Sequence, residues 1–263
     1  MPEGDTIARA AHTLRRALAG KSVRSFRSPA VRADLAGRRV DSVESAGKNL
    51  LVRFDDGRTL RTHMRMHGEW HLYRPGERWR RASALARAVL ETDDWVAVCF
   101  SAPVVEMLRP GRGSTDAERS HPALARLGPD IVAEAFDRDE AIARLQSLPD
   151  LEIGEALLRQ DAVAGIGNIW KSETLFRSRV NPFAAIGALS PCVLADVLDA
   201  ARRLMRARSG AAREPRRTAL AGWEVYRRSG RPCRRCGTAI AVRRQGAHRR
   251  STYWCPRCQG AAP

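Results

Sequence analysis

Four cysteines near the C-terminus form two pairs with the spacing of a metal site. Two residues separate Cys233 from Cys236 and Cys255 from Cys258, and residues 237–254 lie between the pairs. This spacing is typical of a zinc ion held by four thiolates. Because four protein ligands leave no open coordination position, such an ion stabilises a fold and does not bind a substrate. We expect one structural Zn²⁺ within a small β-hairpin.

The chain begins MPEGDT, with a proline and a glutamate directly after the initiator methionine. Pro2 and Glu3 either start a helix with an acidic first turn, or they supply a reactive amine together with its acid. The spacing of apolar residues over 6–19 predicts an amphipathic helix, and Gly20 provides its end. The pattern of the N-terminus alone leaves both interpretations open.

Lys48 is one of only three lysines among 46 basic residues. An arginine stays protonated at any working pH, whereas a lysine can exchange a proton when its pKa is lowered. Lys48 follows Gly47 in the segment SAGKNLL, at the start of an expected strand. Solvated strand edges also carry lysine, so a catalytic amine and a surface charge remain equal alternatives.

Two short loops carry residues suited to nucleic acid. The segment HMRMHGEW holds Arg65, Met66 and His67, and an exposed apolar and cationic tip could fill the space left by an unstacked nucleotide. Alternatively, the methionines belong to the core and His67 is an ordinary surface histidine.

The segment AGIGN, residues 164–168, precedes an expected helix that Asn168 can cap, and its backbone N–H groups could bind a phosphate. An ordinary turn would have the same sequence.

The net charge of the chain favours a polyanionic partner. The formal charge is +17 and the isoelectric point about 11.1, which attracts nucleic acid more readily than a small substrate. Membrane surfaces and acidic proteins are partners that would favour the same positive charge.

No apolar run approaches the roughly 18 residues of a membrane span, and the N-terminus lacks the basic region followed by an apolar region that marks a signal peptide. We therefore expect a cytoplasmic protein.

The apolar pattern along the 263 residues predicts an α+β protein. Period-two alternation between Lys21 and about Pro110 indicates a β-rich domain, with a hairpin around Asp56 and Gly57. A polar, turn-rich stretch follows, and then four helical patterns at 137–147, 153–163, 169–179 and 190–208. We expect an N-terminal domain over 1–115, a linker over 116–130, a helical domain over 131–222 and a zinc hairpin over 223–263.

Four motifs in order resemble the formamidopyrimidine-DNA glycosylase and endonuclease VIII family of DNA repair enzymes. They are the start MPEGD, the lysine segment GKNLLVRF, the segment AGIGNIWKSETLFRSRVNP, which is similar to the helix-two-turn-helix of the family, and the terminal cysteine module. The resemblance implies an N-terminal helix followed by a β-sandwich, a helix-two-turn-helix domain and a zinc finger. It also implies a bacterial, monomeric enzyme that meets double-stranded DNA at the nucleoid.

The resemblance assigns roles to the residues singled out above. Removal of the methionine makes Pro2 the nucleophile that displaces a damaged base, with Glu3 as general acid and base. Lys48 assists departure of the base. The resemblance further implies that Arg65, Met66 and His67 fill the void in the duplex, and that Asn168 and Arg250 clamp the flanking phosphates. Strand cleavage then proceeds by β,δ-elimination.

Two positions depart from the family pattern. Thr6 and Arg159 stand where the family usually has glutamate and aspartate. The start Pro2-Glu3-Gly4 and the segment YWCPRCQ resemble the endonuclease VIII branch, which implies oxidised pyrimidines as the favoured substrates.

Two alternative functions remain. One is a lyase acting on abasic sites with little base excision, and the other is a DNA-binding protein without catalysis.

Overall fold

The chain folds into two compact units, residues 1–126 and 127–263. The computed structural model describes residues 2–110, 118, 121–210 and 222–261. Part of the expected linker, and residues 211–221 at the end of the expected helical domain, therefore lie outside the described residues. Within the described part of the chain, no helix is long and apolar enough to cross a membrane.

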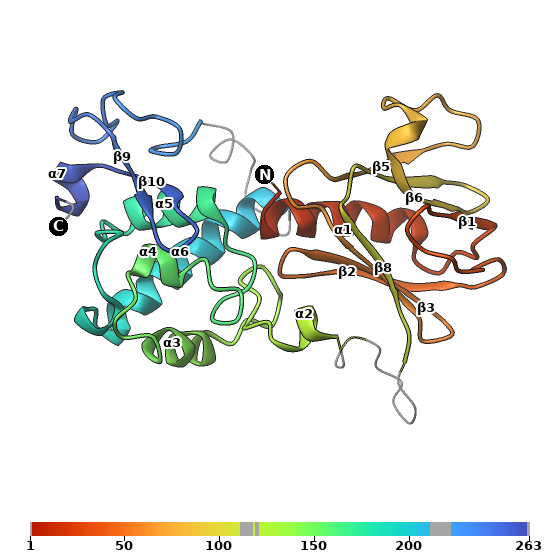
Figure 1. The fold of residues 1–263 in the computed structure, drawn as a ribbon, viewed down its shortest axis with the longest axis horizontal. Coiled ribbons are helices and arrows are strands. Elements are labelled where there is room, and N and C mark those ends of the chain that lie inside the picture. The colour runs from red at the N-terminus through yellow and green to blue at the C-terminus, as the bar shows by residue number, and fades with distance from the viewer. Residues whose placement is uncertain (1, 111–117, 119–120, 211–221, 262–263) are drawn as a thin grey trace. The chain divides into compact units, whose positions relative to one another are not determined.

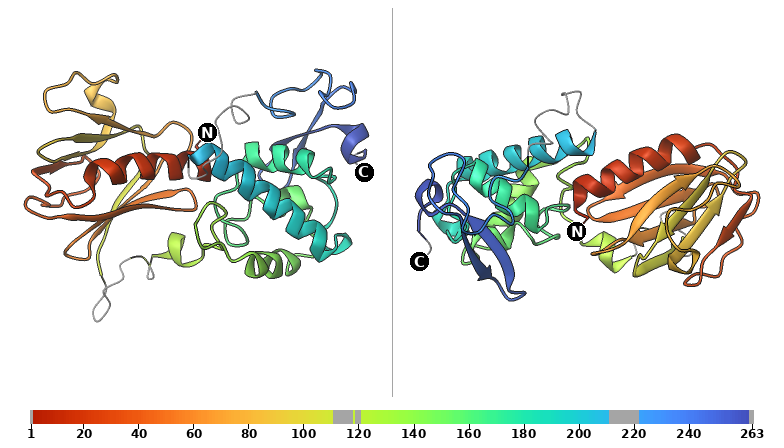
Figure 2. Two further views of the ribbon diagram at one scale, coloured as in Figure 1. Left: turned by 180° about the vertical axis from the view of Figure 1, so that it is seen from behind. Right: turned by 90° about the horizontal axis from the view of Figure 1, so that it is seen from above.

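The first unit is a β-sandwich with one long helix, as the family resemblance implies (Figures 1 and 2). Helix α1 covers Gly4–Leu18, and the short helix α2 covers Pro122–Ala125. Two antiparallel four-stranded sheets have the orders β1-β6-β7-β5 and β2-β3-β4-β8 among the described residues. Their bounds are Ser25–Arg27 (β1), Val40–Ala46 (β2), Asn49–Phe54 (β3), Thr59–His63 (β4), Glu69–Tyr73 (β5), Ala86–Glu91 (β6), Val96–Phe100 (β7) and Val104–Leu108 (β8), with a 3-10 turn η1 at Ser83–Leu85.

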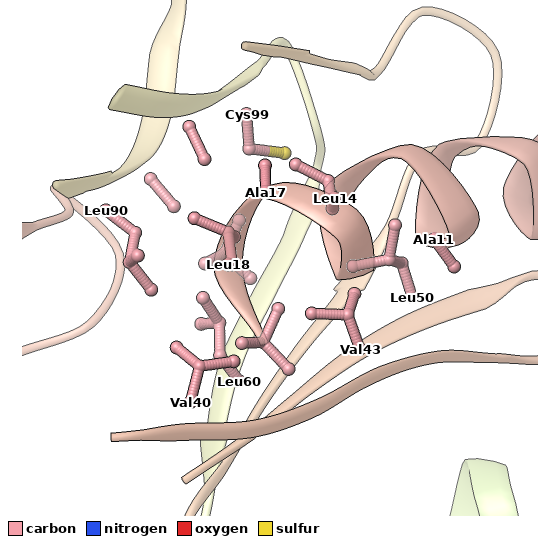
Figure 3. Close-up of a cluster of buried hydrophobic side chains, with 14 of the residues drawn as sticks. Ala11, Leu14, Ala17, Leu18, Val40, Val43, Leu50, Leu60, Leu90 and Cys99 are labelled. Atoms are coloured by element: carbon pink, nitrogen blue, oxygen red, sulfur yellow. The ribbon is translucent and has the colours of Figure 1, made fainter. Parts of the chain in front are cut away.

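Helix α1 supplies part of the sandwich core. Its apolar face, spaced at three and four residues, buries Ile7, Leu14 and Leu18 almost completely. These side chains meet residues from both sheets, among them Val43 and Leu90 (Figure 3). Burial of each large aliphatic side chain contributes roughly 1.5–3 kcal/mol, so the helix is fixed by packing and not by its helix propensity.

The second unit is helical and ends in a β-hairpin. Its elements are α3 (Arg138–Gln146), α4 (Ile153–Ala156), α5 (Asn168–Arg177), η2 (Ile186–Ala188), α6 (Pro191–Ser209), β9 (Ala241–Gln245), β10 (Arg250–Trp254) and α7 (Pro256–Gln259). Strand β10 contacts α5, and both cysteine-rich turns pack near Phe176 of that helix. The cysteine module and the helices therefore form one cluster.

One expected helix is much shorter in the structure. The sequence pattern predicts a helix over 153–163, but α4 includes only Ile153–Ala156. The side chain of Gln160 donates from Nε2 to the carbonyls of Leu158 and Ile166, each at 3.0 Å, and its Oε1 accepts the N–H of Gly165 at 3.1 Å. These bonds hold the chain in a loop, because a side chain can replace the backbone partners of a helix.

The packing of α1 gives a stability prediction. We expect Leu18→Ala to lower the free energy of unfolding of the first unit by about 2–5 kcal/mol, because Leu18 is fully buried and leaves a cavity. Urea titration followed by tryptophan fluorescence measures this change. Leu85→Ala is the control, since Leu85 is 42% exposed and should change stability by less than about 0.5 kcal/mol. Equal effects of the two substitutions would contradict the account.

Candidate nucleic-acid site and zinc centre

Helix α1 holds the first residues of the chain beside a groove in the first unit. Glu3 is the N-cap residue, and its carbonyl accepts the N–H groups of Thr6 at 2.9 Å and Ile7 at 3.1 Å. Its side chain makes no capping hydrogen bond, although it is only 1% exposed. Helix capping therefore explains the position of Glu3 but not its buried carboxylate.

The groove has a volume of about 570 Å³ and runs between α1 and β5. Pro2 and Thr6 line one side, and Met66 and His67 line the other, together with Arg81. Helix α1 contributes the hydroxyls of Thr6 and Thr13 and the guanidinium of Arg9, and Met64, Leu14, Trp70 and Leu72 add apolar surface. The structure thus brings Pro2 and two of the predicted tip residues to one cavity.

Lys48 lies at a tight turn between β2 and β3. Gly47 has φ +58°, a left-handed conformation that glycine adopts without strain. Asn49 follows in the strand, donates from Nδ2 to the Ala46 carbonyl at 2.9 Å, and pairs with His63 of the neighbouring strand. Because Asn49 is the register partner of His63, Lys48 lies one residue from the position opposite this histidine.

The tip between β4 and β5 is a tight turn. Gly68 donates its N–H to the Met64 carbonyl at 2.9 Å, and a Cβ on Gly68 would lie 2.7 Å from the Met64 Cα. Met64 is buried, whereas Met66 is 53% exposed, so one methionine belongs to the core and the other forms the tip. Arg65 has φ +45°, which costs a non-glycine residue of the order of 1–3 kcal/mol.

His63 stabilises this turn, a role that the sequence analysis missed. Its Nδ1 accepts the N–H of Arg65 at 3.2 Å. Burial, followed by the charges of Arg61, Arg65 and Lys48, lowers the pKa of His63 from 6.5 to about 4. The ring is therefore neutral at working pH and carries its proton on Nε2 when Nδ1 accepts. A histidine two residues before a polar tip is too common in sequences to be singled out.

In the second unit, Asn168 does not cap the helix that it begins. Gly167 is the N-cap residue of α5, and the Asn168 Nδ2 donates to the Ser251 carbonyl at 2.7 Å. Ser251 follows Arg250, an exposed residue at the start of β10. The side-chain amide of Asn168 can bond to this distant strand because β10 packs on α5. The structure thereby places the two predicted clamp residues near each other.

A buried lysine supports the same junction. Lys171 is fully buried, and its Nζ donates to Oγ1 of Thr252 at 2.6 Å. That hydroxyl donates to Oε1 of Gln245 at 2.6 Å, and Gln245 Nε2 donates to Glu152 at 2.8 Å. A buried cation is tolerated where polar partners satisfy its protons. Lys171 is one of the three lysines of the chain, and its burial is not visible in its local sequence pattern.

The four cysteines are placed to bind one zinc ion. The sulfur atoms of Cys233, Cys236, Cys255 and Cys258 all lie within 4.8 Å of one another. Tetrahedral zinc with Zn–S bonds of about 2.3 Å separates its sulfurs by roughly 3.8 Å, so the cluster fits with small adjustments. A hydrogen bond from Thr238 lowers the pKa of Cys236, whereas burial raises the pKa values of Cys255 and Cys258.

Comparison with known proteins gives the family. The model of the formamidopyrimidine-DNA glycosylase N-terminal domain matches residues 1–103, the formamidopyrimidine-DNA glycosylase H2TH domain matches 127–211, and the zinc finger found in FPG and IleRS matches 230–260. The chain is 41% identical to the probable endonuclease 8 2 of Streptomyces coelicolor over 100% of this chain and 96% of the relative. It belongs to the formamidopyrimidine-DNA glycosylase and endonuclease VIII family.

Two further matches agree with this assignment. The chain is 36% identical, over the full length of both proteins, to the DNA-(apurinic or apyrimidinic site) lyase Nei2 of Mycolicibacterium smegmatis. The fold is similar to Lactococcus lactis formamidopyrimidine-DNA glycosylase, whose structure contains DNA with an AP site, with a TM-score of 0.79, 21% identity and coverage of 98% and 99% of the two chains. The expected α+β architecture is confirmed.

The two departures from the family pattern have local partners. Thr6 lies beside Asp5, a buried carboxylate in the same helical turn, with 3.5 Å between Oγ1 and Oδ1. Arg159 forms two bonds with the carboxylate of Asp161, at 3.0 and 2.7 Å. An acidic group therefore lies within two residues of each position, and Asp161 neutralises the added cation.

The role of His63 predicts how the turn responds to substitution and pH. We expect His63→Ala to speed hydrogen exchange of the Arg65 amide by roughly 2- to 12-fold, since one hydrogen bond contributes about 0.5–1.5 kcal/mol. His63→Asn should retain protection, because an asparagine oxygen can accept the N–H two residues on. Hydrogen exchange followed by mass spectrometry measures both, and equal exchange in the two variants would contradict the role.

The depressed pKa of His63 sets the sign of the pH effect. The folded state binds this proton less tightly than the unfolded state, so stability falls as the pH drops below about 6.5. The ring protonates near pH 4 in the folded protein, and a protonated Nδ1 cannot accept. Protection of the Arg65 amide should therefore persist at pH 6 and decrease near pH 4 in the wild type.

The cysteine cluster predicts a loss of metal on substitution of one ligand. Cys255→Ser should lower the zinc content from one ion per chain and open the β9–β10 hairpin to proteolysis, because the metal supplies folding energy to such modules. Cys192→Ser is the matched control, since Cys192 is exposed and outside the cluster. Elemental analysis after dialysis measures the zinc, and full retention in Cys255→Ser would exclude this cluster.

Proposed function

We propose that the protein is a bifunctional DNA glycosylase and AP lyase of base excision repair. It removes oxidised bases from double-stranded DNA, with pyrimidines favoured. The observation that carries the proposal is the placement of Pro2 at a groove, directly before the buried Glu3. Membership of the family and the name of the Mycolicibacterium smegmatis relative support the same activity.

Pro2 acts as the nucleophile once Met1 has been removed. Its nitrogen is then a secondary amine, and an α-amino group titrates near pH ~8, so part of it is neutral at working pH. The nitrogen forms a bond to C1′ while the glycosidic bond breaks and the base leaves with a proton. Opening of the sugar ring gives an iminium ion. Loss of a 2′ proton expels the 3′ phosphate, and a second elimination expels the 5′ phosphate.

Glu3 and Lys48 move the protons that these steps require. The buried carboxylate next to the amine can take the proton that the amine nitrogen loses after it bonds to C1′, and the resulting carboxylic acid can protonate the ring oxygen. The Gly47 turn holds Lys48 beside the neutral His63, where an amine can assist departure of the base. The product is a one-nucleotide gap with a phosphate at each end.

The tip residues Arg65, Met66 and His67 replace the nucleotide that leaves the stack. Unstacking costs a few kcal/mol, less for a damaged base, and an apolar wedge offsets part of this cost. Met66 is the first candidate because it is 53% exposed at the tip of a hydrogen-bonded turn. Since the turn is preorganised by Gly68 and His63, little conformational entropy is lost when the wedge enters the duplex.

Asn168 and Arg250 bind the phosphates that flank the lesion. The Asn168 amide retains a second N–H beside the hairpin, and Arg250 is exposed on the adjacent strand. The charge of +17 adds a long-range attraction to DNA. We further propose that the protein acts as a monomer in the cytoplasm and associates with the nucleoid through DNA.

A lyase with little base excision is the second candidate. The name of the Mycolicibacterium smegmatis relative, an apurinic or apyrimidinic site lyase, favours it. Both activities use Pro2 and Glu3, so they differ only in whether the protein removes the base itself.

Borohydride trapping separates these functions. We expect the methionine-processed protein to form a covalent adduct on duplexes that contain 5-hydroxyuracil or an abasic site, with less adduct on 8-oxoguanine. Pro2→Gly and Glu3→Gln should each lower the rate of adduct formation on a damaged base at least 100-fold, because general acid–base catalysis alone contributes about 10²–10⁴-fold. Pro29→Gly, a change in an exposed proline elsewhere in the same unit, is the control.

Two other outcomes of the trapping experiment would each favour a different function. Adduct on the abasic duplex alone would support the lyase and exclude base excision. Tight binding without adduct on any duplex would contradict catalysis and favour a DNA-binding protein.

A further inference from the structure

The loop that follows β5 carries four arginines in eight residues. They are Arg74, Arg78, Arg80 and Arg81. All four are exposed, whereas Trp79, in the middle of the loop, is only partly exposed and packs against the cluster of Tyr73, Val89, Val96, Val98 and Phe100. None of the roles proposed above uses this loop.

The loop is fixed to the outer face of the sheet β1-β6-β7-β5. The ring of Trp79 stacks on Tyr73 with 6.2 Å between centroids and meets the edge of Phe100 at 5.7 Å. The backbone N–H of Arg80 donates to the Tyr73 hydroxyl at 3.1 Å, and that hydroxyl is 2.8 Å from Nδ1 of His71. The ring of Trp79 and the backbone N–H of Arg80 therefore hold the loop against the sheet, while the four arginine side chains are exposed.

Two of the four arginines already have partners. The guanidinium of Arg74 lies 3.8 Å from the ring of Trp95, and its Nη1 donates to the Asp94 carbonyl at 3.2 Å. The guanidinium of Arg81 pairs with Glu69 at 2.8 Å, and the same carboxylate lies 3.1 Å from His71 Nε2. These contacts fix the two ends of the loop.

Arg78 and Arg80 differ from this pair. Neither side chain has a hydrogen bond, ion pair or ring contact with another residue in the described ranges, and both are exposed. They flank Trp79, so two cations without a side-chain partner among the described residues lie on a segment that Trp79 and Tyr73 hold against the sheet. A rigid backbone lowers the entropy lost when an arginine binds, which favours a charged ligand at this position.

The loop borders the groove that contains Pro2. Arg81 is part of the loop and also lines that groove. In duplex DNA each strand carries one phosphate per ~3.4 Å of helix axis. When one nucleotide lies at Pro2, the phosphates of its neighbours on the same strand therefore pass close to the groove. Guanidinium groups bind phosphate oxygens with two parallel N–H bonds. Trp79 points inward, so base stacking is not the mode of contact.

We propose that Arg78 and Arg80 form a second contact site for DNA phosphates, on the first unit and separate from the clamp of Asn168 and Arg250. The inference rests on the proposed function, because it takes DNA at Pro2 as the ligand. The site contributes affinity without reading sequence, since phosphates carry no sequence information. Arg74 and Arg81 position the loop through their bonds within the protein.

The salt dependence of binding tests this site. The double variant Arg78→Ala/Arg80→Ala is compared with Arg24→Ala/Arg32→Ala, which removes two other exposed arginines of the same unit that have no side-chain partner in the described residues. Dissociation constants for a duplex with an abasic-site analogue are measured between 50 and 300 mM salt. Both variants change the net charge equally, so long-range attraction falls equally.

We expect the slope of log affinity against log salt to become shallower by about 1.8 in Arg78→Ala/Arg80→Ala, since each phosphate contact contributes about 0.9. The control should change the slope by much less, and Arg78→Lys/Arg80→Lys should restore most of it. Equal slopes in the test and control variants would overturn the proposal, as would an unchanged slope in both.

The failure of this proposal is distinguishable from failure of the proposed function. Borohydride trapping at saturating protein should be unchanged in Arg78→Ala/Arg80→Ala, because neither residue touches Pro2 or Glu3. If the wild-type protein forms no adduct, the proposed chemistry is wrong. The binding slopes would still show whether Arg78 and Arg80 contact phosphates. A trapping defect at saturation in the loop variant alone would contradict a role limited to phosphate contact.

Discussion

The packing of α1 into the sandwich core is the constraint on which the first unit depends. The first residues of a chain are usually poorly ordered, because nothing offsets their conformational entropy. Here Ile7, Leu14 and Leu18 bury the helix from its first turn to its last, so the residues just before it are held in place. Pro2 then borders a groove, and Glu3 lies almost fully inside the protein. A terminal amine can act as a positioned catalyst only under this condition, since catalysis requires a fixed geometry.

The second unit is held by buried polar bonds as well as by apolar packing. The carboxylate of Glu173 accepts the N–H groups of Glu224, Val225 and Tyr226 at 2.8–3.0 Å, which ties α5 to the segment leading into the cysteine module. Burial raises the pKa of Glu173, and those three bonds oppose the increase. With the bond from Lys171 to the hairpin, they fix the strand that carries Arg250 against α5. The zinc ligands complete this arrangement from the other end of the hairpin.

Local patterns in the sequence predict most elements but few of the contacts between them. Apolar periodicity finds α1, the strands around Gly57 and the long helix α6, because each buries one face. Cysteine spacing finds the zinc centre because the metal requires that geometry. The length of α4, the bond from Asn168 to Ser251, the burial of Lys171 and the link from His63 to Arg65 depend on partners distant in sequence or on side-chain direction. The groove at Pro2 also needed the structure, because its two walls come from α1 and β5.

The central claim is that the nitrogen of Pro2 forms the covalent bond to DNA, and mapping of the trapped adduct tests it most directly. Trypsin digestion of the borohydride-reduced complex, followed by nuclease treatment and mass spectrometry, locates the sugar remnant on one peptide. The account predicts the remnant on residues 2–9, PEGDTIAR, at the proline nitrogen. A remnant on Lys48, within residues 40–53 and with the cleavage after that lysine blocked, would contradict it and make the lysine the nucleophile.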